Sequence, residues 1–160
     1  MNTGDKSMED RFKCRAIDVE NGEWRYGYYA ELPYGLGSSG SSNEYADTAS
    51  FILCCTKKQS SLYSNAEPHE VIVCEQYRIV DKTLSQCTGL CDKNGKLIYE
   101  GDIIRQLDGC IGVIVRQGAS YWIESPGSHA RDLEHSPYYE SVEVIGNFYE
   151  NPELLEAKNE

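Results

Sequence analysis

The sequence predicts a mainly β protein whose strands run antiparallel. Short runs of alternating apolar and polar residues recur along the chain, and this is the pattern of half-buried strands. Asn-Gly, Asp-Gly and Gln-Gly pairs separate several of these runs, and glycine supplies the positive φ angles that tight hairpin turns need. No helix of crossover length is predicted between the runs, so a parallel sheet is disfavoured.

The first elements are expected to form a β-hairpin. Residues 11–18 alternate between apolar and polar side chains, as a half-buried strand does. Asn21-Gly22 makes the turn, and residues 24–32 form a second strand rich in aromatic side chains. Residues 1–10 are polar and read as a loose terminus. The Gly- and Ser-rich segment 35–47 is expected to be a flexible loop.

Further segments complete an N-terminal β subdomain over residues 11–80. Apolar and β-branched side chains predict strands at 51–55, 71–74 and 76–80. Asp81 is then expected to cap a single helical turn over residues 81–85.

From residue 88 onward the pattern is that of a meander. A turn over Asp92–Gly95 joins two apolar segments, and Gly101-Asp102 opens a strand of β-branched residues. Asp108-Gly109 and Gln117-Gly118 mark two more hairpins. Strand openings of this kind resemble those of SH3-like barrels, and closure into a barrel removes exposed edges. We therefore expect an SH3-like antiparallel barrel over residues 88–150.

β-branched residues are expected to supply much of the barrel interior, namely Ile103, Ile104, Val113, Val115, Val144 and Ile145. After the last strand, Asn151 and Pro152 begin a short helical turn, because Asn is a favoured cap and Pro a favoured first residue. Residues 156–160 are expected to be a loose terminus.

The charge of the chain disfavours a general nucleic-acid-binding protein. Its 160 residues carry a net charge of −11, with 15 basic residues among 26 acidic ones. Phosphate binding needs clustered Lys and Arg. A nucleic-acid-linked module, or an acidic mimic of DNA, stays open as an alternative. No run approaches the ~18 apolar residues of a membrane span, so no membrane association is expected.

The cysteines are predicted to be reduced and to bind no structural metal. They number seven, at positions 14, 54, 55, 74, 87, 91 and 110. An odd count without a secretory signal favours a reducing cytoplasm. Cys87 and Cys91 have near-ligand spacing, and Cys54-Cys55, or His69 with Cys74, could complete a zinc site. Paired Cys-x2-Cys knuckles are missing, so small buried side chains are the preferred interpretation.

Acid–base chemistry has candidates but no signature. Five carboxylates could meet in space and hydrolyse a substrate or bind a divalent cation: Asp92, Glu100, Asp102, Glu143 and Glu150. Structural roles explain three of them better: Asp92 belongs to a turn, Asp102 opens a strand, and Glu150 precedes a helix cap. A cysteine nucleophile needs a partner histidine, and the histidines at 69, 129 and 135 lie in polar segments without a local signature. We predict no catalytic residue, no cofactor and no enzyme.

Aromatic side chains offer a different kind of site. A sticky surface could form from Trp24, Tyr26, Tyr28, Tyr29, Tyr34, Tyr121, Trp122, Tyr138 and Tyr139. Alternation assigns roughly half of them to a core, and the rest favour a protein-binding or self-association face.

Three ordered motifs resemble the YopX family of phage and prophage proteins. Residues 12–18 resemble a segment that usually reads Phe-Arg-Ala-Trp-Asp, with Ile17 in place of the Trp. Residues 86–103 match closely, although the family usually has a polar residue or Lys where Cys91 stands. Residues 144–155 match almost throughout. The resemblance covers most of residues 11–155, as a single YopX-like domain.

The resemblance implies a phage or prophage gene product with a β-rich fold, an SH3-like barrel and self-association, and it supplies no catalytic or binding residues. From it we expect an accessory protein that binds proteins or assembles with itself rather than an enzyme. Its partners are expected to be further copies of this chain, or a host or phage protein.

Overall fold

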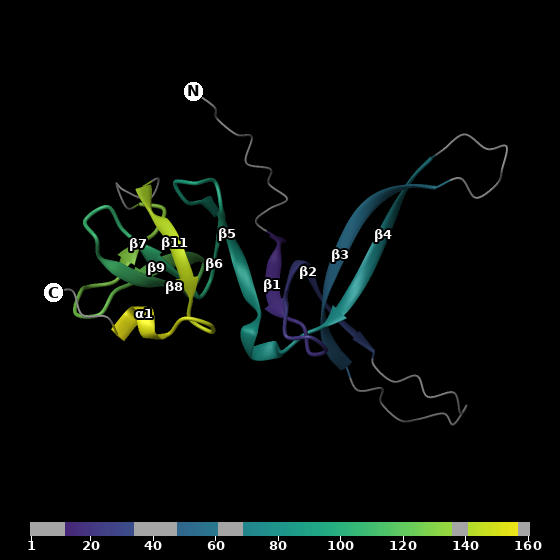
Figure 1. Ribbon diagram of the computed structural model, residues 1–160, viewed down its shortest axis with the longest axis horizontal. Coiled ribbons are helices and arrows are strands. Elements are labelled where there is room, and N and C mark those ends of the chain that lie inside the picture. The colour runs from purple at the N-terminus through teal and green to yellow at the C-terminus, as the bar shows by residue number, and fades with distance from the viewer. Residues whose placement is uncertain (1–11, 34–47, 61–68, 136–140, 157–160) are drawn as a thin grey trace. The chain divides into compact units, whose positions relative to one another are not determined.

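A computed structural model describes residues 12–33, 48–60, 69–135 and 141–156. The chain is mainly β, with two antiparallel sheets and one short α-helix among these residues, which confirms the predicted fold class (Figure 1). It divides into two compact units, one from Lys13 to Leu84 and one that begins at Ser85. Within the described ranges no helix is long and apolar enough to span a membrane. The Gly- and Ser-rich segment 35–47 lies outside the described ranges. The predicted loose termini, 1–10 and 156–160, also lie outside them, except for residue 156.

The N-terminal unit is an antiparallel sheet with the strand order β4-β3-β2-β1. The predicted first hairpin is confirmed, because Ile17 pairs with Trp24 and Gly22 has a φ of 73° at the turn. The two strands predicted at 71–74 and 76–80 are one continuous strand, β4, because Glu75 does not interrupt the ladder. The elements of this unit are β1 Cys14–Ile17, β2 Trp24–Pro33, β3 Thr48–Ser60, β4 His69–Arg78 and the 3-10 turn η2 Asp81–Thr83.

Gly27 lies where β2 changes partner. The strand pairs with β1 through Gly27 and with β3 from Tyr28 onward. A Cβ atom on Gly27 would collide with the carbonyl oxygen of Leu53 and would lie 2.8 Å from its carbonyl carbon. Any larger residue would therefore force the β2 and β3 backbones apart.

The core of this unit is small and lies at one end of the sheet. Ala16, Ile52 and Ile79 are buried together, with partly buried Cys14, Cys54 and Leu84 against them. Thr83 of η2 closes this end, since its Oγ1 donates to the Val80 carbonyl (2.7 Å) and accepts from the Ile17 N–H (2.9 Å). The predicted capping of this turn by Asp81 is wrong, because the residue before the turn is Val80 and no side chain caps it.

The C-terminal unit contains the predicted meander. It contains the five-stranded sheet of order β10-β9-β8-β7-β11, and β5 pairs with β6 around Asp92–Gly95. The predicted turn glycines Gly95, Gly101, Gly109 and Gly118 all have positive φ, from 65° to 84°. The elements are β5 Ser85–Cys91, β6 Leu97–Tyr99, β7 Asp102–Arg105, β8 Ile111–Gln117, β9 Ser120–Glu124, β10 Arg131–Asp132, β11 Glu143–Asn147 and α1 Glu153–Glu156.

The core of the C-terminal unit differs in part from the prediction. Its buried cluster is Ile98, Ile104, Ile114, Ile123, Leu133 and Val142. Ile103 and Ile104 are buried as predicted, but Val113, Val115, Val144 and Ile145 are only half-buried. On β8 the side chain that enters the core is Ile114, from the opposite face to the one predicted.

The described strand pairings do not by themselves close the predicted barrel. β10 and β11 are the terminal strands of an open sheet order, so the SH3-like closure stays a prediction. No helix lies within residues 96–124, all of which are described. The chain after β11 packs back on the sheet, because a Cβ on Gly146 would lie 2.7 Å from the Asn151 Oδ1 atom and 2.9 Å from the Leu154 Cδ1 atom.

Candidate functional site

The five candidate carboxylates do not form one site. Glu143 accepts from the Lys93 ammonium at 2.8 Å on the outside of β11. Asp102 is fully buried and accepts from the Tyr99 N–H at 2.8 Å, where it opens β7. Glu150 accepts from the Asn147 side chain in the turn before α1. Across the described ranges no three His, Cys, Asp or Glu side chains lie close enough together to hold a metal ion.

Asp92 is the most connected of these carboxylates. Its Oδ1 atom accepts from the backbone N–H groups of Asn94 (2.8 Å) and Lys96 (2.9 Å), and its Oδ2 atom accepts from that of Val144 (3.1 Å). Burial would raise the pKa of Asp92, but the N–H groups of Lys96, Val144 and Asn94 together outweigh it and lower the pKa. The carboxylate therefore stays ionised and fastens the β5–β6 turn to β11.

The cysteines include a disulfide, which corrects the prediction that all are reduced. Cys55 on β3 and Cys74 on β4 are direct cross-strand partners, 4.0 Å apart at Cα, and their sulfurs are bonded. The remaining thiols are at positions 14, 54, 87, 91 and 110. The prediction was wrong because it treated an odd number of cysteines as evidence against any disulfide. One disulfide is compatible with an odd count, since it leaves five thiols.

The histidines do not complete a nucleophilic pair in the described part of the chain. The His135 ring lies 3.1 Å from the Asp132 carboxylate on the surface. The side chain of His69 is not described, so the suggested ligand pair of His69 with Cys74 is not tested, although Cys74 itself is in the disulfide.

A shallow cleft lies in the C-terminal unit between β5, the β8–β9 turn and β10. Its volume is about 310 Å³, at the lower end of the range of small-molecule sites. Several polar groups of the cleft bond within the chain: Arg116 donates to Gln86 at 3.3 Å, and Asp132 accepts from the N–H groups of Glu134 and His135. These bonds hold the side chains in place and reduce what they can offer to a ligand.

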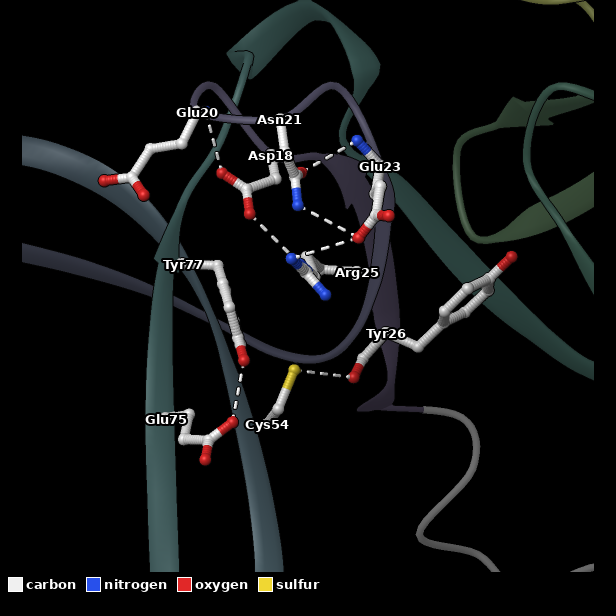
Figure 2. Close-up of polar contacts among 9 residues, drawn as sticks. All are labelled: Asp18, Glu20, Asn21, Glu23, Arg25, Tyr26, Cys54, Glu75 and Tyr77. Atoms are coloured by element: carbon white, nitrogen blue, oxygen red, sulfur yellow. Dashed lines mark hydrogen bonds and ion pairs between the residues drawn. The ribbon is translucent and has the colours of Figure 1, made fainter.

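A polar network braces one face of the N-terminal sheet (Figure 2). Arg25 donates to the buried Asp18 at 3.1 Å, lies 3.3 Å from Glu23, and has its guanidinium 4.2 Å above the Tyr77 ring. The hydrogen bond that Arg25 donates to Asp18 raises the pKa of Arg25. Tyr77 in turn donates to Glu75 at 2.7 Å, and this bond raises the pKa of Tyr77. These hydrogen bonds and ion contacts link β2 to β4 across the sheet, so the network stabilises it.

The opposite face of this sheet carries exposed apolar groups. Tyr28 pairs with Leu53, and alternation places Cys55, its partner Cys74 and then Ile72 on the same side. Tyr26 and Tyr28 are exposed, and Ile72 is 70% exposed. Of the other aromatics in the predicted sticky surface, Trp24, Tyr121 and Trp122 are half-buried, and Tyr29 is exposed on the braced face, where it donates to Glu31. Tyr34, Tyr138 and Tyr139 lie outside the described residues.

The sequence prediction did not single out Ile72 or the disulfide. The part of β3 and β4 that carries them extends beyond β2, whose pairing with β3 ends at Leu53. No local sequence motif marks this extension, because its length depends on where β2 stops pairing with β3. We call residues 54–60 and 69–75 the β-arm.

Two antiparallel sheets and a two-stranded β-arm define a β-rich protein. A family model described as YopX protein matches residues 13–156 of the 160-residue chain. The chain belongs to the YopX family, which confirms the resemblance seen in the three sequence motifs. Comparison with curated proteins gives no match.

Proposed function

We propose that this chain is a phage- or prophage-encoded accessory protein that acts without catalysis, through protein–protein contact, and that it associates with itself. Membership of the YopX family fits a phage-type protein. The observation that carries the contact role is the N-terminal sheet, where an exposed apolar face adjoins a strand with an open edge. In the described sheet β4 is a terminal strand of 10 residues.

An open strand edge favours a second copy of this chain as the partner. An edge of this length presents backbone N–H and C=O groups that another strand can pair with, and self-pairing satisfies both copies at once. The net charge of −11 opposes association. The described side chains of β4, from Ile72 to Arg78, include one acid and one base, so this part of the edge adds no net charge to the repulsion.

The experiment is a measurement of mass by light scattering at low and moderate salt. Exposed charges are screened beyond about 8–10 Å at physiological salt. An apolar interface should therefore persist or tighten as salt is added, whereas an interface of ion pairs would loosen. A monomer mass at both salt concentrations, at tens of micromolar protein, would show that the chain does not self-associate.

A pair of matched variants locates the interface. Ile72 on the β-arm and Leu107 in the C-terminal unit are exposed to nearly the same extent, 70% and 68%. We expect Ile72→Asp to reduce the assembled fraction and Leu107→Asp to leave it unchanged. Equal effects of the two substitutions would mean that β4 is not the contact surface.

A further inference from the structure

The β-arm is a two-stranded ribbon. Among the described residues, β3 beyond Leu53 pairs with β4, from Cys54 opposite Glu75 to Ser60 opposite His69. Figure 1 shows β3 and β4 continuing together away from β2. Ala16, Ile52 and Ile79 form the buried cluster of this unit, and of the described β-arm side chains Cys54, its first residue, packs against that cluster. An isolated two-stranded ribbon is marginally stable in water.

The disulfide lies at the base of this ribbon. Cys55 and Cys74 form the second residue pair beyond Leu53. Both cysteines are exposed, so small solutes can reach the bond. The disulfide therefore links β3 and β4 covalently just beyond the point where pairing with the third strand, β2, ends. Because it is exposed, the S–S bond is open to chemical attack.

The neighbouring thiol does not compete for this bond. Cys54 is adjacent in sequence, but it points to the other face, where its Sγ atom donates to the Tyr26 carbonyl at 3.2 Å (Figure 2). Burial raises the pKa of the Cys54 thiol, so it is a poor source of thiolate. The bond is thus positioned to react with a thiol from solution rather than with its sequence neighbour.

We propose that the Cys55–Cys74 disulfide is a thiol-exchange site for a low-molecular-weight thiol of the glutathione class, and that its opening loosens the β-arm. The thiolate of the small molecule bonds to one cysteine sulfur, the S–S bond breaks, and the other cysteine leaves as a thiolate that takes a proton from water. A second small thiolate then bonds to the sulfur of the first small molecule, the mixed disulfide breaks, and the remaining cysteine leaves as a thiolate that takes a proton from water. Two electrons have passed to the protein, which holds two thiols, and the small molecule has become its own disulfide.

The test uses the full chain, air-oxidised and then treated with reduced glutathione. Alkylation in denaturant counts thiols: of seven cysteines, two are in the bond, so five are expected before treatment and seven after it. Hydrogen exchange followed by mass spectrometry is then measured on peptides from the β-arm and from β7–β8. We expect amides of the β-arm to exchange at least tenfold faster after glutathione, those of β7–β8 to be unchanged, and oxidised glutathione to restore the slow rate.

Two variants make the result decisive. Cys55→Ser cannot form the bond, so its β-arm should exchange fast with or without glutathione, whereas Cys110→Ser should behave like the parent chain. If Cys55→Ser does not fold, the parent chain in excess reductant gives the same comparison. Seven thiols in the oxidised chain, failure of glutathione to open the bond, or equal exchange of the β-arm in both states would each overturn the proposal. The exchange reaction occurs whether or not the chain self-associates, so the two proposals fail independently.

Discussion

Replacing Asp92 by alanine should destabilise the C-terminal unit more than any other single carboxylate change in an exposed turn. The substitution removes three backbone hydrogen bonds to an ionised acceptor, from Asn94, Lys96 and Val144. Hydrogen bonds to charged groups contribute about 1.5–3 kcal/mol each. Water can replace the carboxylate at the two turn donors but less readily at Val144, which is half-buried on β11. We therefore expect a loss of about 2–4 kcal/mol in the free energy of unfolding.

The assay separates the two units by fluorescence. The chain has two tryptophans, Trp24 in the N-terminal unit and Trp122 in the C-terminal unit. In a Trp24→Phe background, urea unfolding followed by Trp122 reports the C-terminal unit alone. Asp108→Ala is the matched control, because Asp108 also sits in a turn but accepts from only one backbone N–H, that of Cys110 at 3.0 Å. If Asp92→Ala costs no more than Asp108→Ala, Asp92 is not the link between the β5–β6 turn and β11.

The pH dependence of this effect has a defined sign. The pKa of Asp92 is lower in the folded chain than in the unfolded one, since the backbone N–H groups stabilise its ionised form. Its contribution is therefore complete above the unfolded value of about 3.9 and is lost as the pH falls through the folded value. The difference in stability between the parent and Asp92→Ala should shrink below about pH 4. A difference that stays constant down to pH 2 would mean that the charge is not involved.

Three further outcomes can be checked by urea unfolding. Gly27→Ala should cost about 1–3 kcal/mol in the N-terminal unit, as overpacking does, because its Cβ meets the Leu53 backbone; unchanged stability would show that β2 and β3 can separate there. Leu133→Ala should cost about 2–5 kcal/mol in the C-terminal unit, since Leu133 is fully buried in its core. Arg25→Lys should lower the midpoint despite keeping the charge, because lysine lacks the planar group that stacks on Tyr77; a midpoint equal to that of the parent would exclude a role for the stacking.

The turns were the most predictable part of the fold, for a local reason. Gly22, Gly109 and Gly118 each adopt the positive φ that their dipeptides predict. The face of β8 was not predictable, because the run from Ile111 to Val115 contains no polar side chain to mark the solvent side. In the folded chain the face of β8 that carries Gly112 lies inside, because a Cβ on Gly112 would lie 2.7 Å from the Ile123 side chain.

The candidate site depends on features that sequence patterns do not encode. The pairing of Cys55 with Cys74 follows from the β3–β4 register, and register is set by the whole ladder rather than by the spacing of 19 residues. The exposure of Ile72 follows from the point at which β2 leaves β3, after Tyr28 opposite Leu53. In contrast, the structural role of Asp92 was predictable, because an Asp that opens an Asp-Lys-Asn-Gly turn commonly accepts from the backbone ahead of it.

The position of β11 has a consequence for how the chain folds during synthesis. β7, β8, β9 and β10 pair with successive neighbours, so their contacts are local and can form as soon as each hairpin has left the ribosome. The other edge of β7 is different, because its partner is β11, which follows all of them in the chain. Until residues 143–147 have been translated, the nascent sheet keeps that edge of β7 unpaired, next to the fully buried Ile103 and Ile104 of the finished protein. Completion of the sheet therefore waits for residues 143–147, and a ribosome that stalls before them releases a chain with an apolar strand edge open to its neighbours.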